Sequence, residues 1–399
     1  MDFSSLFETA NRKMQNSKAI LRRGQLESLP WEAQLIGIRG ARGVGKTTLL
    51  LQRLNNLNLP VNKALYVSCD HLWLSKNSLL LLADGFVKQG GKFLFLDEVH
   101  KYPNWAQEIK NMYDDYPELK VVFTGSSMLD ILNARADLSR RALSFTMQGL
   151  SYREYLMLVH GIELPVLNLP EILSNHIEIS REFLLKFKPL EHFGHYLKNG
   201  YYPYFQEVPE MYHLRIQEVV NLILEIELPL LRQVDVSYIR KLKQLLLIIS
   251  ESVPFVPNVS KLSERIVVNR NTFISYLHYL EEAGLTQNLY RDIQGVSRLQ
   301  KPDKIYLENP NLHYALSFTQ PNAGHIRECF FLNQVKFKHQ IEFVDAGDFK
   351  VNQRTVFELG GPSKNKKQIH AQKDAYIVAD NLEIGSENRI PLWLFGFLY

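Results

Sequence analysis

The feature that most restricts the fold of this chain is the octet at residues 40–47, Gly-Ala-Arg-Gly-Val-Gly-Lys-Thr, which matches the pattern G-x-x-x-x-G-K-[ST] in full. Glycines at this spacing let the backbone turn tightly and bring its N–H groups against an anion without a Cβ in the way. The apolar run at residues 35–38 suits a buried strand, and a helix is expected to begin near Lys46, with its positive end toward the same anion. The octet therefore predicts a phosphate-binding loop between a strand and a helix.

A second pattern lies further along the chain, where the apolar run Phe93–Leu96 ends in Asp97 and Glu98. Residues 64–68 indicate another buried strand, and residues 120–123 indicate a fourth. Parallel α/β sheets bind ligands at the carboxyl ends of their strands, so Asp97 is expected close to the phosphate-binding loop. In this order and spacing, the two patterns predict ATP binding and hydrolysis with Mg²⁺ as the second cofactor.

Each residue of the predicted site has an expected role. Lys46 places a positive charge at the β- and γ-phosphates, and the hydroxyl group of Thr47 ligates Mg²⁺. Asp97 holds the ion through a water molecule, and Glu98 orients or deprotonates the attacking water. Thr47 and Asp97 are thus the expected metal ligands. The residues expected to bind the nucleotide are Gly40, Arg42, Gly43, Val44, Gly45, Lys46, Thr47, Thr48 and Ser126.

The polar cluster after the fourth strand has two interpretations. Thr124, Ser126 or Ser127 senses the γ-phosphate or positions water, because the strand end faces the predicted site. Alternatively, these side chains form an ordinary strand-to-helix cap, since Ser and Thr are good N-caps.

Composition limits the class of protein without naming a partner. A chain of 399 residues is long enough for two to four domains. Its net charge of +4 permits contact with nucleic acid but does not argue for it. Cys69 and Cys329 match no metal spacing and are expected to be buried thiols in a reducing compartment. With no secretion signal and no apolar run of about 20 residues, a cytoplasmic protein without a membrane partner is expected.

The apolar patterns divide the chain into four expected segments. Residues 1–150 are expected to form an α/β P-loop NTPase domain, in which a helical lead-in over residues 1 to about 30 precedes the alternating strands and helices of residues 31–150 that a parallel sheet requires. Residues 151–235 are mostly helical and are expected to be a lid or connector. Residues 236–300 follow a winged helix-turn-helix pattern. Residues 301–399 indicate a second α/β arrangement, with a helix at 324–335, another near 368–373 and an apolar strand at the end.

The segment at 236–300 leaves two uses open. If it binds DNA, the residues that face the groove are Arg270, Asn271, Ser275 and His278. The third helix of the segment has few basic residues, which favours a winged helix used for domain packing or oligomer contacts. DNA and further copies of the same chain are therefore open as partners.

Several quoted segments together resemble a large prokaryotic family of predicted AAA-type ATPases, AAA_14-like, whose members carry a C-terminal DUF4143 region. The segments are Gly37–Thr48, Phe95–Trp105 and Thr124–Ser127, and Leu197–Pro203 is similar to a further family element, with Asn199 in place of a glycine. The resemblance covers nearly the whole chain. It implies an ATPase whose nucleotide state controls the winged helix and the C-terminal domain.

The resemblance also implies an arginine at the γ-phosphate. Where members of the family have Gly-Arg, this chain has Arg140 and Arg141. Arg141 is the candidate, acting on its own site or on a neighbour's, and Arg140 is the alternative. A surface arginine without a catalytic role is equally compatible with the sequence.

The C-terminal region of the family resembles a restriction-endonuclease fold. Such a site would use Glu328, Asp348 and Glu358 to hold Mg²⁺. Gly360 stands where the chemistry requires lysine, so a degenerate domain is expected unless Lys364, Lys366 or Lys367 takes that place. Besides the controlling ATPase, two functions thus stay open: an ATP-regulated DNA-binding protein or nuclease, and a slow nucleotide-dependent signalling switch.

Overall fold

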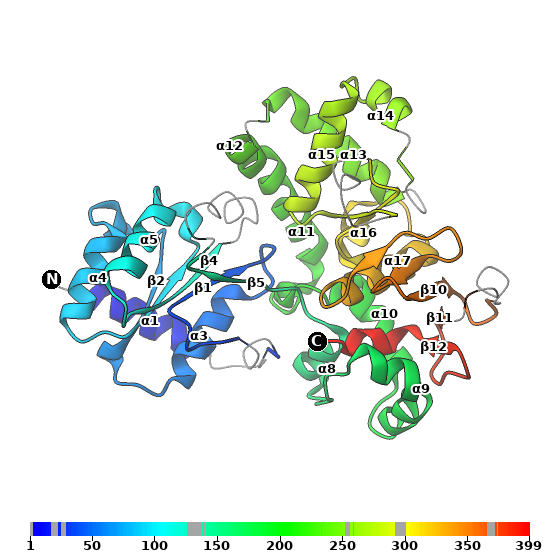
Figure 1. The fold of residues 1–399 in the computed structure, drawn as a ribbon, viewed down its shortest axis with the longest axis horizontal. Coiled ribbons are helices and arrows are strands. Elements are labelled where there is room, and N and C mark those ends of the chain that lie inside the picture. Colours follow the sequence, from blue (N-terminus) through cyan, green and yellow to red (C-terminus); the bar gives the residue numbers. More distant parts are fainter. Residues whose placement is uncertain are drawn as a thin grey trace. The chain divides into compact units, whose positions relative to one another are not determined.

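The computed structural model describes residues 3–16, 23–24, 29–125, 138, 140–232, 234–251, 256–257, 259–291, 301–364, 372 and 374–399. The chain divides into two compact units, Met1–Gly149 and Leu150–Tyr399 (Figure 1). The boundaries expected within residues 151–399 stay predictions.

The first unit is built on a five-stranded sheet with the order β2-β3-β4-β1-β5. Its strands are β1 Leu35–Arg39, β2 Ala64–Ser68, β3 Phe93–Asp97, β4 Lys120–Gly125 and β5 Leu143–Thr146. All neighbouring strands run parallel, which confirms the predicted parallel sheet. The central strands are apolar over most of their length because helices cover the sheet on both faces. β1 leads into the phosphate-binding loop. In the sheet order β4 lies next to β1, and β3 lies beyond β4 on the same side.

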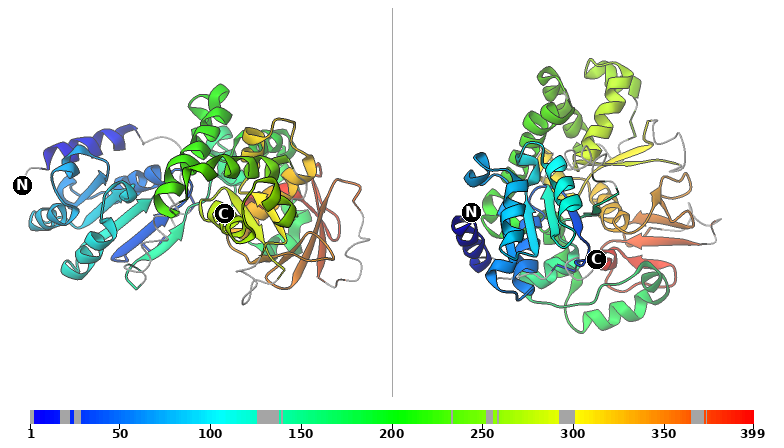
Figure 2. Two further views of the ribbon diagram at one scale, coloured as in Figure 1. Left: turned by 90° about the horizontal axis from the view of Figure 1, so that it is seen from above. Right: turned by 60° about the vertical axis from the view of Figure 1, so that its left-hand side comes forward.

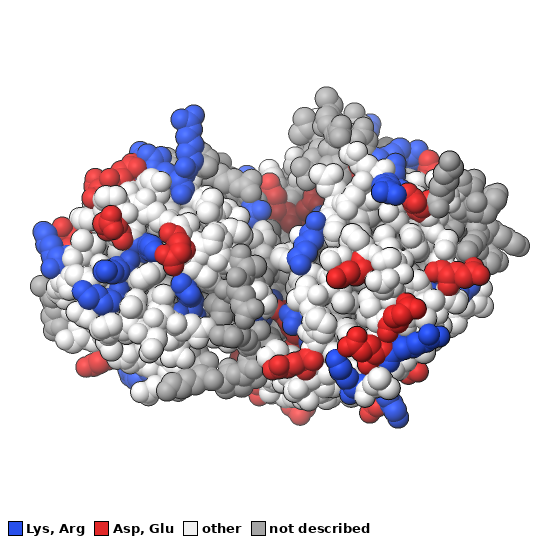
Figure 3. Space-filling view, turned by 60° about the horizontal axis from the view of Figure 1, so that its bottom comes forward, with Lys and Arg blue, Asp and Glu red and all other residues white. Residues whose placement is uncertain are grey.

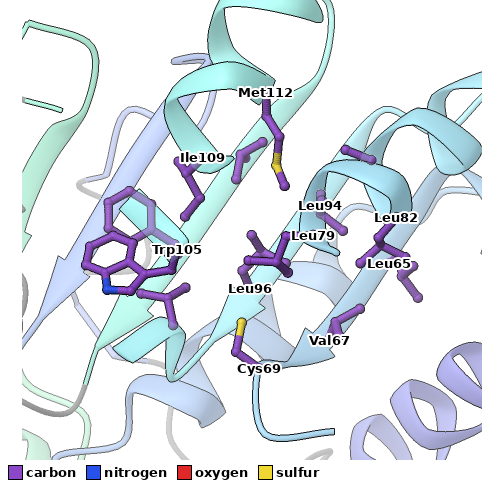
Figure 4. Close-up of a cluster of buried hydrophobic side chains, with 14 of the residues drawn as sticks. Leu65, Val67, Cys69, Leu79, Leu82, Leu94, Leu96, Trp105, Ile109 and Met112 are labelled. Carbon is purple, nitrogen blue, oxygen red and sulfur yellow. The ribbon is translucent and has the colours of Figure 1, made fainter. Parts of the chain in front are cut away.

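Helices bury the apolar residues of this sheet. They are α1 Ser4–Asn16, α3 Lys46–Asn56, α4 Leu79–Lys88 and α5 Trp105–Asp115, with short 3-10 turns at Val61–Lys63, Leu72–Ser75 and Val99–Lys101. Figure 4 shows the cluster in which side chains of α4 and α5, such as Leu82 and Ile109, pack on strand residues such as Leu65, Leu94 and Leu96. α1 packs against the edge strand β2 and against α3.

The second unit begins with helices, as predicted. These are α8 Tyr152–His160, α9 Leu169–Leu184, α10 Pro189–Asn199, α11 Tyr212–Leu222 and α12 Leu228–Arg232, with a π-helical segment Ile223–Glu227 between the last two. Capping boxes start α8 and α9, where Ser151 and Asn168 cap the helix N-termini and a glutamate three residues on returns the bond. Short 3-10 turns occur at Pro203–Gln206, Pro209–Met211 and Val236–Tyr238.

The helices α13 Ile239–Glu251, α14 Val259–Arg265 and α15 Arg270–Glu282 follow. The side chain of Asn269 accepts a hydrogen bond from the backbone of Thr272 and so caps α15. β6 Thr286–Leu289 and β7 Lys304–Leu307 then pair antiparallel. The expected order of three helices followed by a strand pair is therefore present, and the winged-helix interpretation is taken up below as a proposal.

A second five-stranded sheet completes the chain, in the order β12-β11-β10-β9-β8. After α16 Pro310–Leu316 and α17 Ala323–Lys336 come β8 Ile341–Glu342, β9 Phe349–Val351, β10 Thr355–Gly360, β11 Ala375–Ala379 and β12 Arg389–Pro391. β10, β11 and β12 run parallel, whereas β8, β9 and β10 run antiparallel, so this sheet is mixed. Its strands are coloured orange to red in Figure 2. The helix expected near 368–373 lies almost wholly outside the described residues.

The expected terminal strand is wrong, because Leu392–Phe397 forms a 3-10 helix. Pro391 lacks an N–H group and ends the sheet pairing just before this run. All six side chains of the run are buried, and an apolar run without periodicity does not distinguish a strand from a short buried helix. None of the helices in the described part of the chain combines the length and the apolar character that a membrane crossing requires.

Candidate active site

The loop between β1 and α3 has the backbone that its glycines predicted. Gly43 and Gly45 have φ angles of 81° and 101°, in the left-handed region that side chains with a Cβ rarely adopt. A Cβ placed on Gly40 would lie 2.3 Å from the carbonyl oxygen of Met147. The loop therefore requires glycine both for its turn and for its close approach to the chain beyond β5.

Lys46 lies at the first position of α3 and is buried. Its ammonium group donates hydrogen bonds of 2.8 Å to the carbonyl oxygens of Gly40 and Ala41. The cation is thus held across its own loop, where phosphate oxygens would replace the carbonyl groups as partners. Val44 is fully buried, so it anchors the loop while the neighbouring backbone stays open to a ligand.

A buried arginine ties this loop to the end of the first unit. The guanidinium group of Arg23 donates to the carbonyl oxygen of Val44 at 2.9 Å. It also donates to the carbonyl oxygens of Gln148 and Gly149, at 2.7 Å and 3.0 Å. Sequence reasoning missed this residue, because nothing in the local pattern separates it from a surface arginine.

Asp97 is the centre of the site. Its side chain is 2% exposed and accepts hydrogen bonds from three hydroxyl groups. Thr47 and Tyr66 both donate to Oδ2 at 2.7 Å, and Thr124 donates to Oδ1. A carboxylate accepts about four hydrogen bonds, so most of its capacity is already oriented by the loop, β2 and β4.

The oxygen atoms of Thr47 and Asp97 suit magnesium. Mg²⁺ prefers hard oxygen ligands and is bound by one or two carboxylates together with substrate phosphates and water. The described residues hold no group of three or more His, Cys, Asp or Glu side chains able to bind a metal ion.

Glu98 follows Asp97 in a left-handed conformation, with a φ of 54°, which is rare for a residue with a side chain. Its N–H group donates to the hydroxyl oxygen of Thr124 at 3.1 Å. Its carboxylate forms an ion pair with Lys101, which also binds Asp70 at 2.8 Å. Backbone strain of this kind gathers at functional sites.

Two titratable side chains, Glu98 and His100, have shifted pKa values in this site. Burial alone would raise the pKa of Glu98, but the hydrogen bond and charge of Lys101, helped by Arg42, outweigh it and hold that pKa below its ordinary value. For His100, burial lowers the pKa to about 4, against the opposing charge of Glu98. At neutral pH the site thus combines an ionised Glu98 with a neutral imidazole.

The structure brings together Lys46, Thr47, Asp97, Glu98 and Thr124. Thr124 lies at the end of β4, as expected, but its hydroxyl group bridges Asp97 and the backbone of Glu98. Ser126 and Ser127 lie outside the described residues. Arg42 is half-buried and close enough to lower the pKa of Glu98, whereas Thr48 is exposed on α3.

Tyr66 was missed by sequence reasoning, which used residues 64–68 only as a strand. The sequence did carry one indication, because Tyr66 places a hydroxyl group within an otherwise apolar strand segment. It becomes informative once the register is known, because Ser68 pairs with Asp97 and Tyr66 lies two residues earlier on the same face.

The structure does not bring Arg141 to the loop of its own chain. Residue 141 precedes β5 and therefore lies at the end of the sheet where the parallel strands begin. The loop follows β1 and therefore lies at the opposite end of the sheet. The guanidinium group of Arg141 pairs with Asp114 in the last turn of α5, at 2.8 Å and 2.9 Å. The expectation that it acts on its own site is therefore corrected. Arg140 is exposed beside it, at the same end of the sheet.

The acidic residues of the C-terminal unit are compensated by lysines. Lys304 lies 4.0 Å from Glu328 and 3.7 Å from Asp348, and Lys364 forms an ion pair with Glu358. Burial and the charge of Asp348 raise the pKa of Glu328. A lysine thus does reach Glu358 from the following loop, but no metal-holding group is found among the described residues. Lys366 and Lys367 lie outside them.

Two family models match separate parts of the chain. Residues 32–156 match the AAA domain family AAA_14. Residues 190–322 match a domain of unknown function, DUF8612, so the DUF4143 region that the resemblance predicted is not what is found there. The first unit is accordingly similar to AAA-type P-loop ATPase domains, in agreement with its loop and parallel sheet.

A curated relative and several solved structures are also similar. An uncharacterized protein of Methanocaldococcus jannaschii is 27% identical over 285 residues, which are 68% of this chain, and the match spans 60% of that relative's length. A Walker-type ATPase of Pyrococcus abyssi is 14% identical with a TM-score of 0.43, covering 79% of this chain and 95% of its own. The ORC1 protein of Aeropyrum pernix in complex with DNA is 14% identical with a TM-score of 0.31, covering 77% and 91%.

Proposed function

We propose that this protein binds ATP with Mg²⁺ and hydrolyses it to ADP and phosphate. The observation that carries the proposal is the meeting of Thr47 and Asp97, at 2.7 Å, directly beside the glycine loop and Lys46. A hydroxyl oxygen and a carboxylate beside a cradle of backbone N–H groups are the parts that phosphoryl transfer requires. Composition alone does not bring these parts together.

The roles follow from the geometry. The loop amides and Lys46 bind the phosphates, while Thr47 and Asp97 hold the magnesium ion that neutralises charge on them. Glu98, ionised because Lys101 keeps its pKa low, accepts a proton from the attacking water or orients it. Glu98 must then exchange its bond to Lys101 for one to water, so this ion pair opposes turnover until nucleotide is in place.

The arginine of the proposed reaction is supplied by a second copy of the chain. Arg141 lies at the end of its own sheet opposite the loop, and its guanidinium group forms an ion pair with Asp114. Because Arg141 does not face its own loop, its proposed role is to stabilise the transition state at the phosphates of another copy. Mixing Lys46→Ala chains with Arg141→Ala chains tests this, because each supplies what the other has lost. Turnover should reappear in the mixture, and its absence would remove the trans role.

The central experiment measures nucleotide binding and turnover separately. Lys46→Ala should abolish ATP binding, measured with a fluorescent nucleotide. Glu98→Gln should keep ATP binding and lose turnover, since it keeps the shape of the side chain and removes the base. Lys63→Ala serves as the matched control and should change neither, because Lys63 is a partly exposed lysine whose ammonium group donates to the carbonyl oxygen of Gly90. Unchanged ATP affinity in Lys46→Ala would defeat the proposal.

A slow nucleotide-dependent switch is the second candidate, and the position of Arg141 favours it. Phosphoryl transfer without a well-placed arginine is slow, so an isolated chain would hold ATP for long periods. Turnover per chain should then rise with protein concentration as copies assemble. A rate independent of concentration, together with a constant mass by light scattering, would speak for a self-contained ATPase.

We propose that residues 236–300, with β7 as the partner strand, form a winged helix used for domain packing or oligomer contacts rather than for reading DNA. The helices α13 to α15 and the pair β6–β7 support the fold. Arg270 and Asn271 are exposed at the start of α15, yet Arg291 near the pair is bound to Asp345 at 2.7 Å. Figure 3 brings forward the lower side of Figure 1 rather than α13 to α15, and on that face basic and acidic side chains are interspersed. A shift in DNA-binding assays that Arg270→Ala abolishes would reverse this choice.

A further inference from the structure

A line of hydrogen bonds leads from the N-terminal helix to the centre of the site. The ammonium group of Lys13 on α1 donates to the hydroxyl oxygen of Tyr66 at 3.2 Å and lies 5.0 Å from the centre of its ring. Tyr66 in turn donates to Oδ2 of Asp97 at 2.7 Å, the same oxygen that Thr47 binds. One lysine outside the sheet is thus connected through a single side chain to the expected magnesium ligand.

The position of Lys13 follows from the amphipathic pattern of α1. Phe3, Leu6 and Ala10 are buried at helical spacing, and Lys13 continues the same stripe three residues later. The apolar part of the stripe packs into the core, whereas its last position meets the hydroxyl group of Tyr66. α1 contacts β2 more than any other element of the unit, so its docking sets where Lys13 lies.

Tyr66 itself is held firmly. Its side chain is 1% exposed within β2, between strand neighbours fixed by the register with β3. Its hydroxyl group donates to Oδ2 of Asp97 at 2.7 Å, and it cannot rotate away without leaving a buried carboxylate short of one partner.

We infer that Tyr66 is a positioning residue for Asp97, and that Lys13 makes this positioning depend on the docking of the N-terminal helix α1. Tyr66 and Thr124 hold the carboxylate in the orientation in which Oδ2 faces Thr47. Magnesium binding at Thr47 and Asp97 is then strongest when α1 is docked. The inference rests on the proposed function, since it concerns the metal of the same site, and it adds a route by which a segment outside the sheet regulates it.

The test uses the full chain and compares Tyr66→Phe with Tyr116→Phe. Both substitutions remove a hydroxyl group that donates to a carboxylate, but Tyr116 binds Asp84 away from the loop, at 3.1 Å. The affinity for a fluorescent ATP analogue is measured across a magnesium titration and again without metal. Tyr66→Phe should raise the half-saturating magnesium concentration about tenfold, because a hydrogen bond to a charged acceptor is lost. Affinity without metal should stay within about twofold of the parent protein.

Lys13→Met keeps the inference testable if Tyr66→Phe folds poorly. It should raise the half-saturating magnesium concentration about threefold, since it weakens the positioning indirectly, and Lys88→Met is the exposed control. In the double variant, Lys13→Met should add nothing to the effect of Tyr66→Phe, because the lysine acts through that hydroxyl group. Effects that multiply instead would show that Lys13 acts by another route and would overturn the coupling.

The outcomes separate this inference from the proposed function. If the parent chain binds nucleotide in a magnesium-dependent way and Tyr66→Phe titrates like Tyr116→Phe, only the inference fails. If the parent chain shows no nucleotide binding that Lys46→Ala removes, the proposed function fails first. A loss of affinity in Tyr66→Phe that is equal with and without magnesium would indicate general damage and would also overturn the inference.

Discussion

Replacing Thr124 by valine tests how the site is held together. The side chain is fully buried at the end of β4, and valine reproduces its shape without the hydroxyl group. That group donates to Oδ1 of Asp97 and accepts the N–H of Glu98 at 3.1 Å. One atom therefore sets both the carboxylate that would hold magnesium and the backbone from which the expected base projects.

The expected loss of turnover in Thr124→Val follows from the hydrogen bonds that the hydroxyl group makes. A hydrogen bond to a charged acceptor contributes about 1.5–3 kcal/mol, and about 1.4 kcal/mol corresponds to tenfold in a rate or equilibrium. Thr124→Val should therefore lower magnesium-dependent turnover by about 10–100-fold, while affinity for metal-free nucleotide is little changed. Thr124→Ser keeps the hydroxyl group and loses a methyl group, so its turnover should stay within about threefold of the parent.

The assay is steady-state phosphate release, with tryptophan fluorescence to verify folding. Trp105 is well placed as a reporter, because its ring lies 5.6 Å from that of Phe123, the residue before Thr124. An intact emission spectrum with reduced turnover in the valine variant would support the argument. Equal turnover in the valine and serine variants would refute it, because the hydroxyl group would then orient nothing that the reaction uses.

Other predictions follow from neighbouring features. Lys101→Met should raise the pKa of Glu98, because the cation now lowers it, and should move the acid limb of the pH–rate profile to higher pH; an unmoved limb would exclude Glu98 as the base. Gly40→Ala should destabilise the protein by about 1–3 kcal/mol in thermal unfolding, because its Cβ would meet a backbone oxygen at 2.3 Å, and an unchanged midpoint would mean that the loop adjusts freely. His100 has a folded pKa of about 4 against an ordinary 6.5, so its unfolded form binds the proton first. Stability should fall between pH 6.5 and pH 4 by up to about 2 kcal/mol, allowing for partial exposure, and His100→Gln should flatten that part of the curve.

The sequence predicted those parts of the site that local pattern encodes. Glycine spacing, the run before Asp97 and the alternation of strands and helices are all readable within short windows, and the loop and parallel sheet agree with them. Tyr66 was not readable, since its role depends on which strand lies beside β3. The position of Arg141 likewise depends on strand pairing. Only the parallel pairing of β5 with β1 shows that residue 141 lies at the end of the strands opposite the loop.

The second unit shows the same limit on a larger scale. Its helices follow periodicity and caps, such as the capping box at Ser151, and were foreseen in outline. The 3-10 helix Leu392–Phe397 was not foreseen, because all of its residues are buried and its apolar residues show no helical or strand periodicity. Lys304, which lies near Glu328, is 24 residues earlier in the chain and was not indicated by pattern or spacing, whereas Lys364, which pairs with Glu358, was among the lysines that the sequence suggested.

The hydrogen bonds of Arg23 link the phosphate-binding loop to the end of the first unit. A single guanidinium group is shared between the backbone at Val44 and the backbone at Gln148 and Gly149, the last residues before the second unit begins. If the loop binds a triphosphate as proposed, a displacement of the loop would either break these bonds or pull residues 148–149 with it. Arg23 would then couple the segment that leaves the first unit to the state of the loop.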